Sequence, residues 1–460
     1  MERVDTLTIG AGGGAYPAAF SLVRAGQRVF MVDKKGLMSG NCLAEGCVPS
    51  KAIREVAGFL RRAQQGQEFG LSGAENFDYA GVIAHKDRLQ TQRYQQHDRQ
   101  LAALGDRLKL IKGTARLIEP HVVEIEMDND VGRYHADSII VASGADVAVP
   151  PIPGTEYCLT SRDIYALDPR LARLPHRMAI IGAGYIGLET ACILTVFGVK
   201  VSVLEMTGQA LPGMDPDFVN QLVSLLDPRI DLILNAQVEK IEREDETTRV
   251  YYRQDGREKT IEAEQAMMAA GRKPVTPEGS EKAGLKVEHG RVQVSSALQT
   301  DVPHIYACGD VNGRSPLFHS AVRQSLVAAH NILAGNLPAD YMDFDSVPTT
   351  IFTFPEAAYV GIVRDVAKRR GLSITEASYS FADDSRAQIF HETTGELRLF
   401  FETGNLRLVG GWVIGIDAAN LIGEIGLAVS GRLTAHDLAR FPDQHPMASE
   451  GISKAARSLF

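Results

Sequence analysis

The stretch TLTIGAGGGA, residues 6–15, decides the fold of the first part of the chain. Its apolar run ends at a GxGxxA pattern formed by Gly10, Gly12 and Ala15, and the residues that follow have the apolar spacing of a helix. A second apolar run ends at Asp33. This order of strand, glycine turn, helix and acidic strand end predicts a dinucleotide-binding unit, because glycines let the backbone approach a pyrophosphate at the helix N-terminus.

The same signature returns further along the chain. Gly182, Gly184 and Gly187 follow an apolar run, and the next predicted strand ends at Glu205. Two such units imply two nucleotide cofactors. An acidic strand end accepts hydrogen bonds from a ribose 2′-OH and repels a 2′-phosphate, and residues 206–208 contain no arginine, so NAD is favoured over NADP at this site. The alternative is an acidic strand end without a ligand.

The composition limits the class of protein. A prior of about 150 residues per domain divides the 460 residues into roughly three domains. The net charge of −9 gives no basic field for nucleic acid or anionic lipid. Five cysteines are too few for a secreted disulfide scaffold. The sequence has neither an uncharged apolar span of about 18 residues nor a leader pattern, so we expect a cytoplasmic protein without a membrane span.

Breaks in the pattern divide the chain into segments. The stretch PPIPG, residues 150–154, forbids a helix and separates the two nucleotide units. The stretch AAGRKP, residues 269–274, again breaks the structure, and from about residue 343 the pattern changes to a mixture of strands and helices. We expect the α/β class, with two Rossmann-like domains followed by an α+β domain.

The stretch GNCLAEGCVPSK, residues 40–51, carries the most chemistry. Five residues of ideal helix rise about 7.5 Å, more than the roughly 4.4 to 6.8 Å between the Cα atoms of a disulfide, so bridging Cys42 and Cys47 needs a distorted backbone at Gly46. Pro49 suits the first turn of a following helix, whose N-terminus would lower a thiol pKa. Half of a metal site or two buried free thiols are the alternatives. No second CxxC and no His/Cys cluster supports a metal.

Together these motifs resemble the pyridine nucleotide–disulfide oxidoreductases, and among them the dihydrolipoamide dehydrogenases, over essentially the whole length. The resemblance rests on IGAGGGAY, GNCLAEGCVPSK, GAGYIGLE, AAGRKP, IYACGD and VPTTIFTFPEAAYVG, and on His445-Pro446 followed by Glu450. It implies an FAD-binding domain made of residues 1–150 and 273–342, an NAD-binding domain at 151–272, and a dimerisation domain at 343–460.

The resemblance also implies a role for each site residue. Cys42 would attack the substrate disulfide, Cys47 would lie beside the flavin, and His445 with Glu450 would be the base, contributed by the other subunit of a homodimer. The FAD-binding residues implied are Gly10, Gly12, Ala15, Asp33, Lys51, Ser143, Gly144, Gly309, Asp310 and His319. The NAD-binding residues implied are Gly182, Gly184, Gly187, Glu189, Glu205 and Gly271. Lys51 and Glu189 would form an ion pair, because neither charge tolerates burial alone.

The expected activity is oxidation of protein-bound dihydrolipoyl groups by NAD through a Cys42–Cys47 disulfide and FAD. The partner would be a lipoyl-bearing carrier protein or a small disulfide or dithiol. The sequence departs from the family where Asp443 replaces the first histidine of an HxHP motif near the substrate mouth. Two alternatives are an NAD(P)H-dependent reductase of another disulfide and a flavoprotein subunit without catalytic activity.

Overall fold

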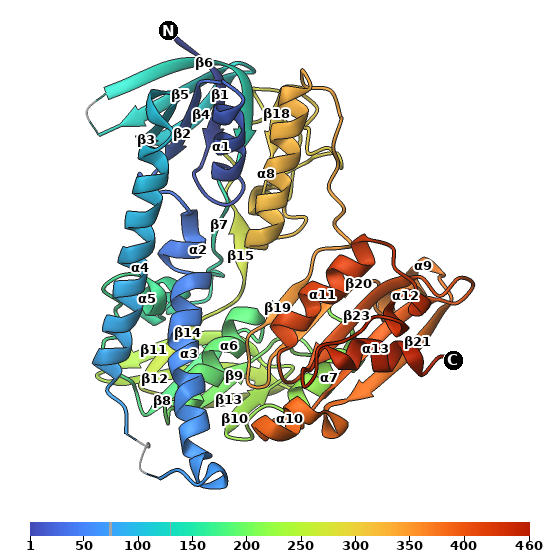
Figure 1. The fold of residues 1–460 in the computed structure, drawn as a ribbon. Coiled ribbons are helices and arrows are strands. Elements are labelled where there is room, and N and C mark those ends of the chain that lie inside the picture. The colour runs from blue at the N-terminus through green and yellow to red at the C-terminus, as the bar shows by residue number, and fades with distance from the viewer. Residues whose placement is uncertain (73–75, 129) are drawn as a thin grey trace.

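The computed structural model describes residues 1–72, 76–128 and 130–460. Its chain forms three lobes: one with the N-terminus and helix α8 (Phe318–Leu333), one with the middle of the chain, and one with the C-terminus (Figure 1). One lobe is built on a mixed sheet whose first strands are parallel, the second on a parallel sheet and the third on an antiparallel sheet. The predicted class, two Rossmann-like domains and a C-terminal α+β domain, is therefore confirmed.

The first lobe is built on a seven-stranded sheet. Its order is β3 (Leu108–Lys112), β2 (Val29–Asp33), β1 (Glu2–Ile9), β6 (Asp130–Val141), β5 (Val122–Met127) and β4 (Thr114–Glu119), and β18 (Ile305–Ala307) also pairs with β6. Strands β1, β2, β3 and β18 run parallel to their neighbours, and β4 to β6 form an antiparallel meander. The glycine turn joins β1 to α1 (Tyr16–Arg24), which buries Ala18, Ala19, Leu22 and Val23.

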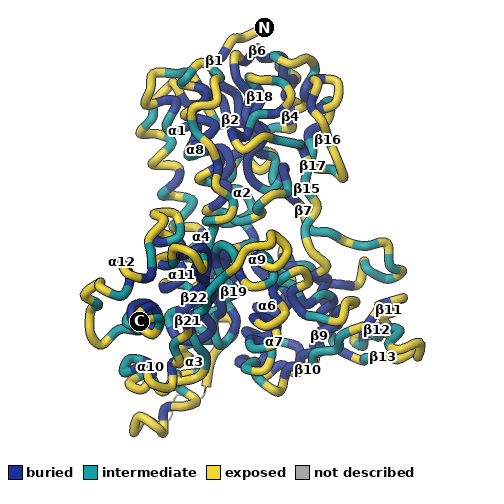
Figure 2. Tube along the Cα trace, turned by 90° about the vertical axis from the view of Figure 1, so that its right-hand side faces the viewer, coloured by how far each residue is buried: buried dark blue, intermediate teal, exposed yellow. Residues whose placement is uncertain are grey.

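The second lobe repeats this arrangement on a smaller scale. Its parallel sheet has the order β10 (Ile230–Ile233), β9 (Lys200–Leu204), β8 (Arg177–Ile181) and β14 (Gln265–Met268), and a second sheet is formed by β11 (Gln237–Glu244), β12 (Thr247–Gln254) and β13 (Arg257–Ala263). Helix α6 (Tyr185–Val196) is almost entirely buried, whereas the tips of the β11–β13 sheet are exposed (Figure 2). Helix α7 (Pro216–Ser224) completes the lobe.

The C-terminal lobe has a five-stranded antiparallel sheet. Its order is β19 (Thr349–Ile351), β20 (Ala357–Gly361), β23 (Leu408–Ile414), β22 (Glu396–Glu402) and β21 (Ile374–Ser380). Its helices are α9 (Arg364–Arg370), α10 (Ser385–Phe390), α11 (Ala418–Ser430), α12 (Ala435–Ala439) and α13 (Glu450–Arg457). Helices α11 and α13 contact the strands of this sheet.

Helices α2 (Gly40–Ala44), α3 (Cys47–Gln64) and α4 (Tyr79–Ala102) run from the first lobe alongside the second (Figure 1). Between these lobes, β7 (Ala145–Val147) pairs with β15 (Arg272–Pro274). The break in structure that the sequence predicts over residues 269–274 is therefore wrong for residues 272–274, which form a strand. Helix α5 (Ser161–Tyr165) follows β7. Strands β16 (Val287–Glu288) and β17 (Arg291–Val292) form a small hairpin.

Across the described ranges, no helix is both long and apolar enough to cross a membrane.

Trp412 fixes one contact between the C-terminal and second lobes. It lies in β23, is 1% exposed, and meets the ring of Phe218 from α7 edge-on at 5.8 Å between centroids. We expect Trp412→Ala to lower the free energy of unfolding by about 3–5 kcal/mol, because a large buried ring leaves a cavity. Urea denaturation followed by circular dichroism measures this loss. The control Leu337→Ala, at a residue 65% exposed, should change the midpoint little; equal effects of the two variants would contradict the assignment.

Candidate active site

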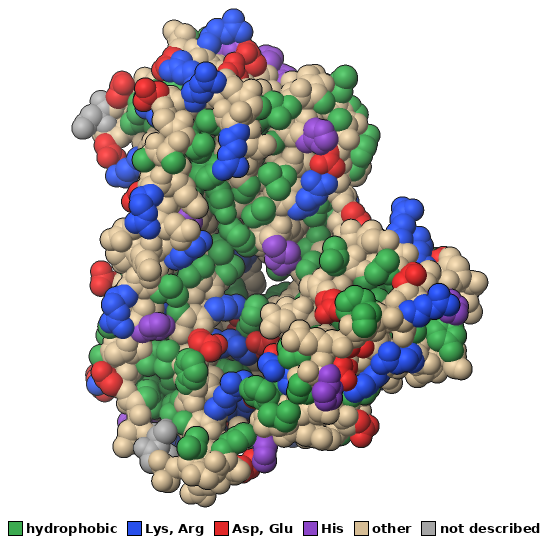
Figure 3. Space-filling model, in the orientation of Figure 1, with side chains coloured by type: hydrophobic (Ala, Val, Ile, Leu, Met, Phe, Trp, Pro, Cys, Tyr) green, Lys and Arg blue, Asp and Glu red, His purple; other side chains and the backbone are tan. Residues whose placement is uncertain are grey.

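A cavity of about 2100 Å³ lies where the lobes meet, and both glycine turns and both cysteines line it. Figure 3 shows the molecule hollowed between the first lobe and the C-terminal lobe. The two turns have matching geometry. Gly10 and Gly182 have φ of 113° and 110°, and an added Cβ would lie 2.2 Å from the carbonyl oxygen of Ala142 and 2.4 Å from that of Ala269. Only glycine fits either turn, which leaves the backbone accessible to a phosphate group.

The two cysteines lie on consecutive helices. Cys42 is in α2, Cys47 is the first residue of α3, and both are thiols. The backbone leaves the helical path between them, as the spacing predicts, and a Cβ at Gly46 would lie 2.9 Å from the carbonyl oxygen of Asn41. Cys47 is exposed towards the cavity. The N-terminus of α3 therefore presents a thiol to the cavity.

The two thiols differ in acidity. The pKa of Cys47 is lowered to about 7: a hydrogen bond from Cys42 is the largest cause and the charge of Lys51 acts in the same direction, while burial and the charge of Glu189 act against them. The same hydrogen bond raises the pKa of Cys42. Near neutral pH Cys42 therefore keeps its proton, while Cys47 is divided between thiol and thiolate, and the thiolate is the reactive form of a cysteine.

The predicted ion pair between Lys51 and Glu189 is formed. Lys51 Nζ lies 2.7 Å from Glu189 Oε2, and the backbone N–H of Phe352 donates to Glu189 Oε1 at 3.0 Å. Lys51 Nζ also lies 4.4 Å from the centroid of the Phe352 ring. Lys51 lies in α3, Glu189 lies in α6, and Phe352 directly follows β19. All three lobes therefore meet at this pair.

Of the residues predicted to bind FAD, Asp33, Gly144, Gly309 and Asp310 line the cavity. Burial raises the pKa of Asp310, and the charge of Arg272 acts in the opposite direction. A half-buried carboxylate beside an open cavity fits a hydroxyl-rich ligand such as the ribityl chain of FAD.

Two other residues predicted for FAD also line the cavity, but their side chains have contacts within the protein. The hydroxyl of Ser143 donates to the carbonyl oxygen of Val275, so this side chain connects two parts of the chain. His319, the second residue of α8, lies with Nε2 2.7 Å from the carbonyl oxygen of Pro348. Each of these side chains therefore already has one partner within the protein.

Glu205, predicted to bind NAD, follows β9 and is 6% exposed. Its Oε2 accepts from the backbone N–H of Ala183 at 3.0 Å, and its Oε1 accepts from the N–H and the hydroxyl of Thr207, each at 2.9 Å. A carboxylate has about four acceptor positions, so it can still receive a ribose hydroxyl. Gly184, Glu205 and Gly271 all line the cavity, whereas Gly187 lies against the carbonyl oxygen of Gly182.

The predicted base lies apart from the cysteines of its own chain. His445 Nδ1 is 2.9 Å from Glu450 Oε1, which also accepts from the N–H of Met447 at 3.2 Å, and Lys454 lies 3.2 Å from Glu450 Oε2. Burial raises the pKa of Glu450, but these donors bring it below its ordinary value. The His445 side chain is 68% exposed, and neither member of the pair is among the described residues that line the cavity.

Asp443, which replaces the first histidine of the HxHP motif, has its partners within its own lobe. Its carboxylate accepts a hydrogen bond from Ser453 and lies 3.8 Å from Arg457, both on α13, and its side chain is only 10% exposed. The carboxylate is therefore turned towards its own lobe. It ties the segment that carries His445 to α13.

Sequence reasoning missed a set of polar residues around the cysteines. The residues concerned are Lys35, Glu45, Lys86, Gln90 and Arg162. Most of the partners are distant in sequence, so no local pattern shows them. The only sequence signal is a carboxylate between two cysteines. In the ranges that the structure covers, no three His, Cys, Asp or Glu residues are grouped to hold a metal.

Three comparisons agree with this geometry. The family model for pyridine nucleotide-disulphide oxidoreductase matches residues 4–325, and that for the family's dimerisation domain matches residues 347–456. The dihydrolipoyl dehydrogenase of Geobacillus stearothermophilus is 32% identical over 99% of this chain and 96% of its own length, and that of Bacillus subtilis is 31% identical over the same shares.

Solved structures give the same result. LpdA of Mycobacterium tuberculosis superposes with a TM-score of 0.90 at 25% identity, with all of both chains covered. The HOCl-induced flavoprotein disulfide reductase RclA of Escherichia coli, solved as a Cu(II) complex, gives 0.87 at 25% identity with the same coverage. The chain belongs to the pyridine nucleotide-disulphide oxidoreductase family.

Proposed function

We propose that the protein is a homodimeric, NAD-dependent flavoprotein that oxidises protein-bound dihydrolipoyl groups. The observation that carries this proposal is the pair of thiols in α2 and at the start of α3. The Lys51–Glu189 ion pair lies about one helical turn beyond Cys47, in a cavity lined by both glycine turns. The dihydrolipoyl dehydrogenases among its relatives support the choice of substrate. The three buried cysteines outside the site are unpaired, which agrees with a reducing, cytoplasmic setting.

The residues divide the reaction between them. A substrate thiolate attacks the sulfur of Cys42 in the Cys42–Cys47 disulfide, and Cys47 leaves as a thiolate that Lys51 stabilises. The second substrate thiol then displaces Cys42, which closes the lipoyl disulfide. His445 accepts a proton, and Glu450 holds its ring in place. FAD, when bound, supplies a two-electron relay from the dithiol to NAD, which leaves as NADH with one proton.

The base is proposed to come from a second copy of the chain. His445 is largely exposed and lies outside the cavity of its own chain. The match of residues 347–456 to a dimerisation domain supports this arrangement. Each active site would then need both subunits.

Reduction of another disulfide by NADH is the second candidate. It is favoured by the likeness to RclA, a flavoprotein disulfide reductase. The machinery would be the same, with electrons flowing from NADH to the substrate. The two candidates therefore differ only in the substrate that reacts with Cys42.

The first test is anaerobic reduction of NAD by dihydrolipoamide and by a lipoylated carrier protein. We expect wild-type turnover, loss of activity in Cys42→Ser, and a loss of about 10²–10⁴-fold in His445→Gln, which is the usual contribution of a general base. Reduction of a dye by NADH needs neither residue and is the control. Turnover by neither dithiol, with dye reduction intact, would reject the lipoyl proposal and favour another disulfide.

The acidity of Cys47 gives a second test. Its pKa of about 7 lies below the ordinary 9.0, so thiolate forms as the pH rises through 7. Lys51→Met removes a stabilising cation and should raise this pKa, whereas Glu189→Gln removes an opposing anion and should lower it. The absorbance that a thiolate produces beside oxidised flavin, titrated against pH in the two-electron-reduced enzyme, measures both. Shifts in the same direction would contradict the arrangement.

The cofactor preference gives a third test. We expect kcat/KM to be at least about 100-fold higher with NAD than with NADP, a difference of about 2.7 kcal/mol, because Glu205 repels a 2′-phosphate. Glu205→Gln should lower the ratio of kcat/KM with NAD to kcat/KM with NADP, because the amide keeps a hydrogen-bond acceptor but carries no charge. Steady-state kinetics with both nucleotides decides this, and an equal preference in the wild type would exclude the proposed role of Glu205.

A further inference from the structure

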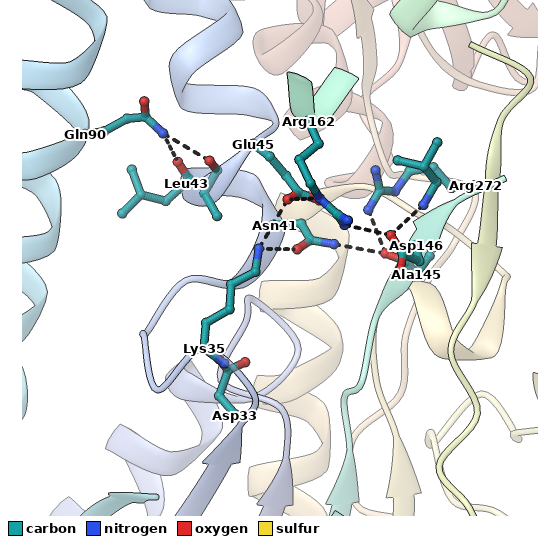
Figure 4. Close-up of polar contacts among 12 residues, drawn as sticks. Asp33, Lys35, Asn41, Leu43, Glu45, Gln90, Ala145, Asp146, Arg162 and Arg272 are labelled. Carbon is teal, nitrogen blue, oxygen red and sulfur yellow. Dashed lines mark hydrogen bonds and ion pairs between the residues drawn. The ribbon is translucent and has the colours of Figure 1, made fainter. Parts of the chain in front are cut away.

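The segment between the two cysteines carries a buried carboxylate. The Glu45 side chain is 1% exposed. Arg162 donates a hydrogen bond to each of its carboxylate oxygens, from Nε to Oε2 at 2.8 Å and from Nη2 to Oε1 at 3.1 Å. Lys35 Nζ lies 3.2 Å from Oε2 (Figure 4). A two-pronged arginine–carboxylate pair fixes orientation as well as position.

The charge on Glu45 depends on these partners. Burial alone would raise the pKa of this carboxyl, but the hydrogen bond from Arg162 and the charge of Lys35 hold it below its ordinary value. Glu45 is therefore ionised near neutral pH. Removing Arg162 or Lys35 would leave the buried Glu45 carboxylate with less positive charge beside it, which raises the free energy of the folded protein.

The two residues that bind Glu45 lie on either side of β7, the strand between the first and second lobes. Lys35 follows β2 in the first lobe, whereas Arg162 lies in α5, beyond β7. Arg162 also donates to Asp146 Oδ1 in β7 at 2.8 Å. Asn41, immediately before the first cysteine, donates to the carbonyl oxygen of Ala145 in the same strand at 2.9 Å (Figure 4). One short strand therefore restrains the chain on both sides of Cys42.

A third contact comes from helix α4. Gln90 Nε2 donates to the carbonyl oxygens of Leu43 at 2.9 Å and Ala44 at 3.1 Å. These carbonyls end α2 and have no partner within that helix. Gln90 is held in turn by the fully buried Lys86, whose Nζ donates to its Oε1 at 3.0 Å.

We propose that Glu45, held by Arg162 and Lys35, is a positioning residue that sets the reduction potential of the Cys42–Cys47 pair. Reduction breaks the S–S bond with two electrons from a dithiol that itself becomes a disulfide; of the two protons this dithiol gives up, one goes to Cys42 and the other goes to solvent when Cys47 is a thiolate. A segment held on three sides keeps the two sulfur atoms close after the bond breaks. The bond therefore re-forms readily, and the potential is more negative than that of a loose pair. The inference builds on the proposed function.

The variants Glu45→Gln and Arg162→Gln test the proposal. Both loosen the segment, so both should make the potential less negative, each by about 30 mV, which equals a tenfold weaker tendency to close a disulfide. A purely electrostatic effect would act differently. Glu45→Gln leaves excess positive charge, which favours thiolate, whereas Arg162→Gln leaves excess negative charge, which disfavours it, so the two shifts would have opposite signs.

The measurement uses the FAD-loaded protein equilibrated in mixtures of reduced and oxidised dithiothreitol. Acid quenching, alkylation and mass spectrometry of the cysteine peptide then give the reduced fraction. No lipoyl substrate is present, so this result is independent of the substrate assignment. Arg170→Gln, which removes a contact to Asp163 in α5 without touching the segment, should leave the potential unchanged.

Two further variants make the outcome decisive. Gln90→Met removes the hydrogen bonds from α4 to the end of α2 without changing any charge, and it should also make the potential less negative. This variant therefore tests the proposal even if Arg162→Gln does not fold. Arg162→Lys keeps the charge but not the two-pronged contact and should restore only part of the wild-type value. Opposite shifts in the first two variants, or a wild-type potential in Glu45→Gln and Gln90→Met, would overturn the proposal.

Discussion

The ion pair between Lys51 and Glu189 is the interaction on which the arrangement of this molecule depends. It joins α3 to α6, and the N–H of Phe352 from the C-terminal lobe completes it. Neither charge could be kept in this partly buried place without the other. Because the same lysine lowers the pKa of Cys47, the contact that gathers the three lobes also prepares the thiol for chemistry.

The polar residues near the cysteines then fall into two groups with different tasks. Lys51 and Glu189 act on the charge of the sulfur that faces the cavity. Glu45 and its partners contact the chain between the sulfurs, and their charges largely cancel within the group. Acidity and geometry of the pair are therefore controlled by separate residues, which is why substitutions can distinguish them.

Much of the fold could be predicted from the sequence. Apolar runs that end in glycines located β1, β8 and the helices after them, because both the burial of parallel strands and the turn geometry leave local patterns. The pairing of β7 with β15 was missed, because strands of three residues show no periodicity. Lys51, Glu189, His445 and Glu450 were found only through resemblance to a family.

The rest of the site lay outside any sequence pattern. Glu45 and Arg162 are 117 residues apart, and nothing local marks them as partners. The carboxylate of Asp443 accepts a hydrogen bond from Ser453 ten residues later, a contact that only the folded helix brings about. Spacing predicts what a backbone does, whereas the partner of a side chain is decided by tertiary structure.

The central claim, that Cys42 of one subunit works with His445 of the other, is tested most directly by mixing two inactive proteins. Cys42→Ser and His445→Gln homodimers are combined in equal amounts, and subunit exchange is verified by native mass spectrometry. The account predicts recovery of roughly a quarter of wild-type activity, since half of the dimers are mixed and each of these has one intact site. Complete exchange without any recovered activity would contradict it.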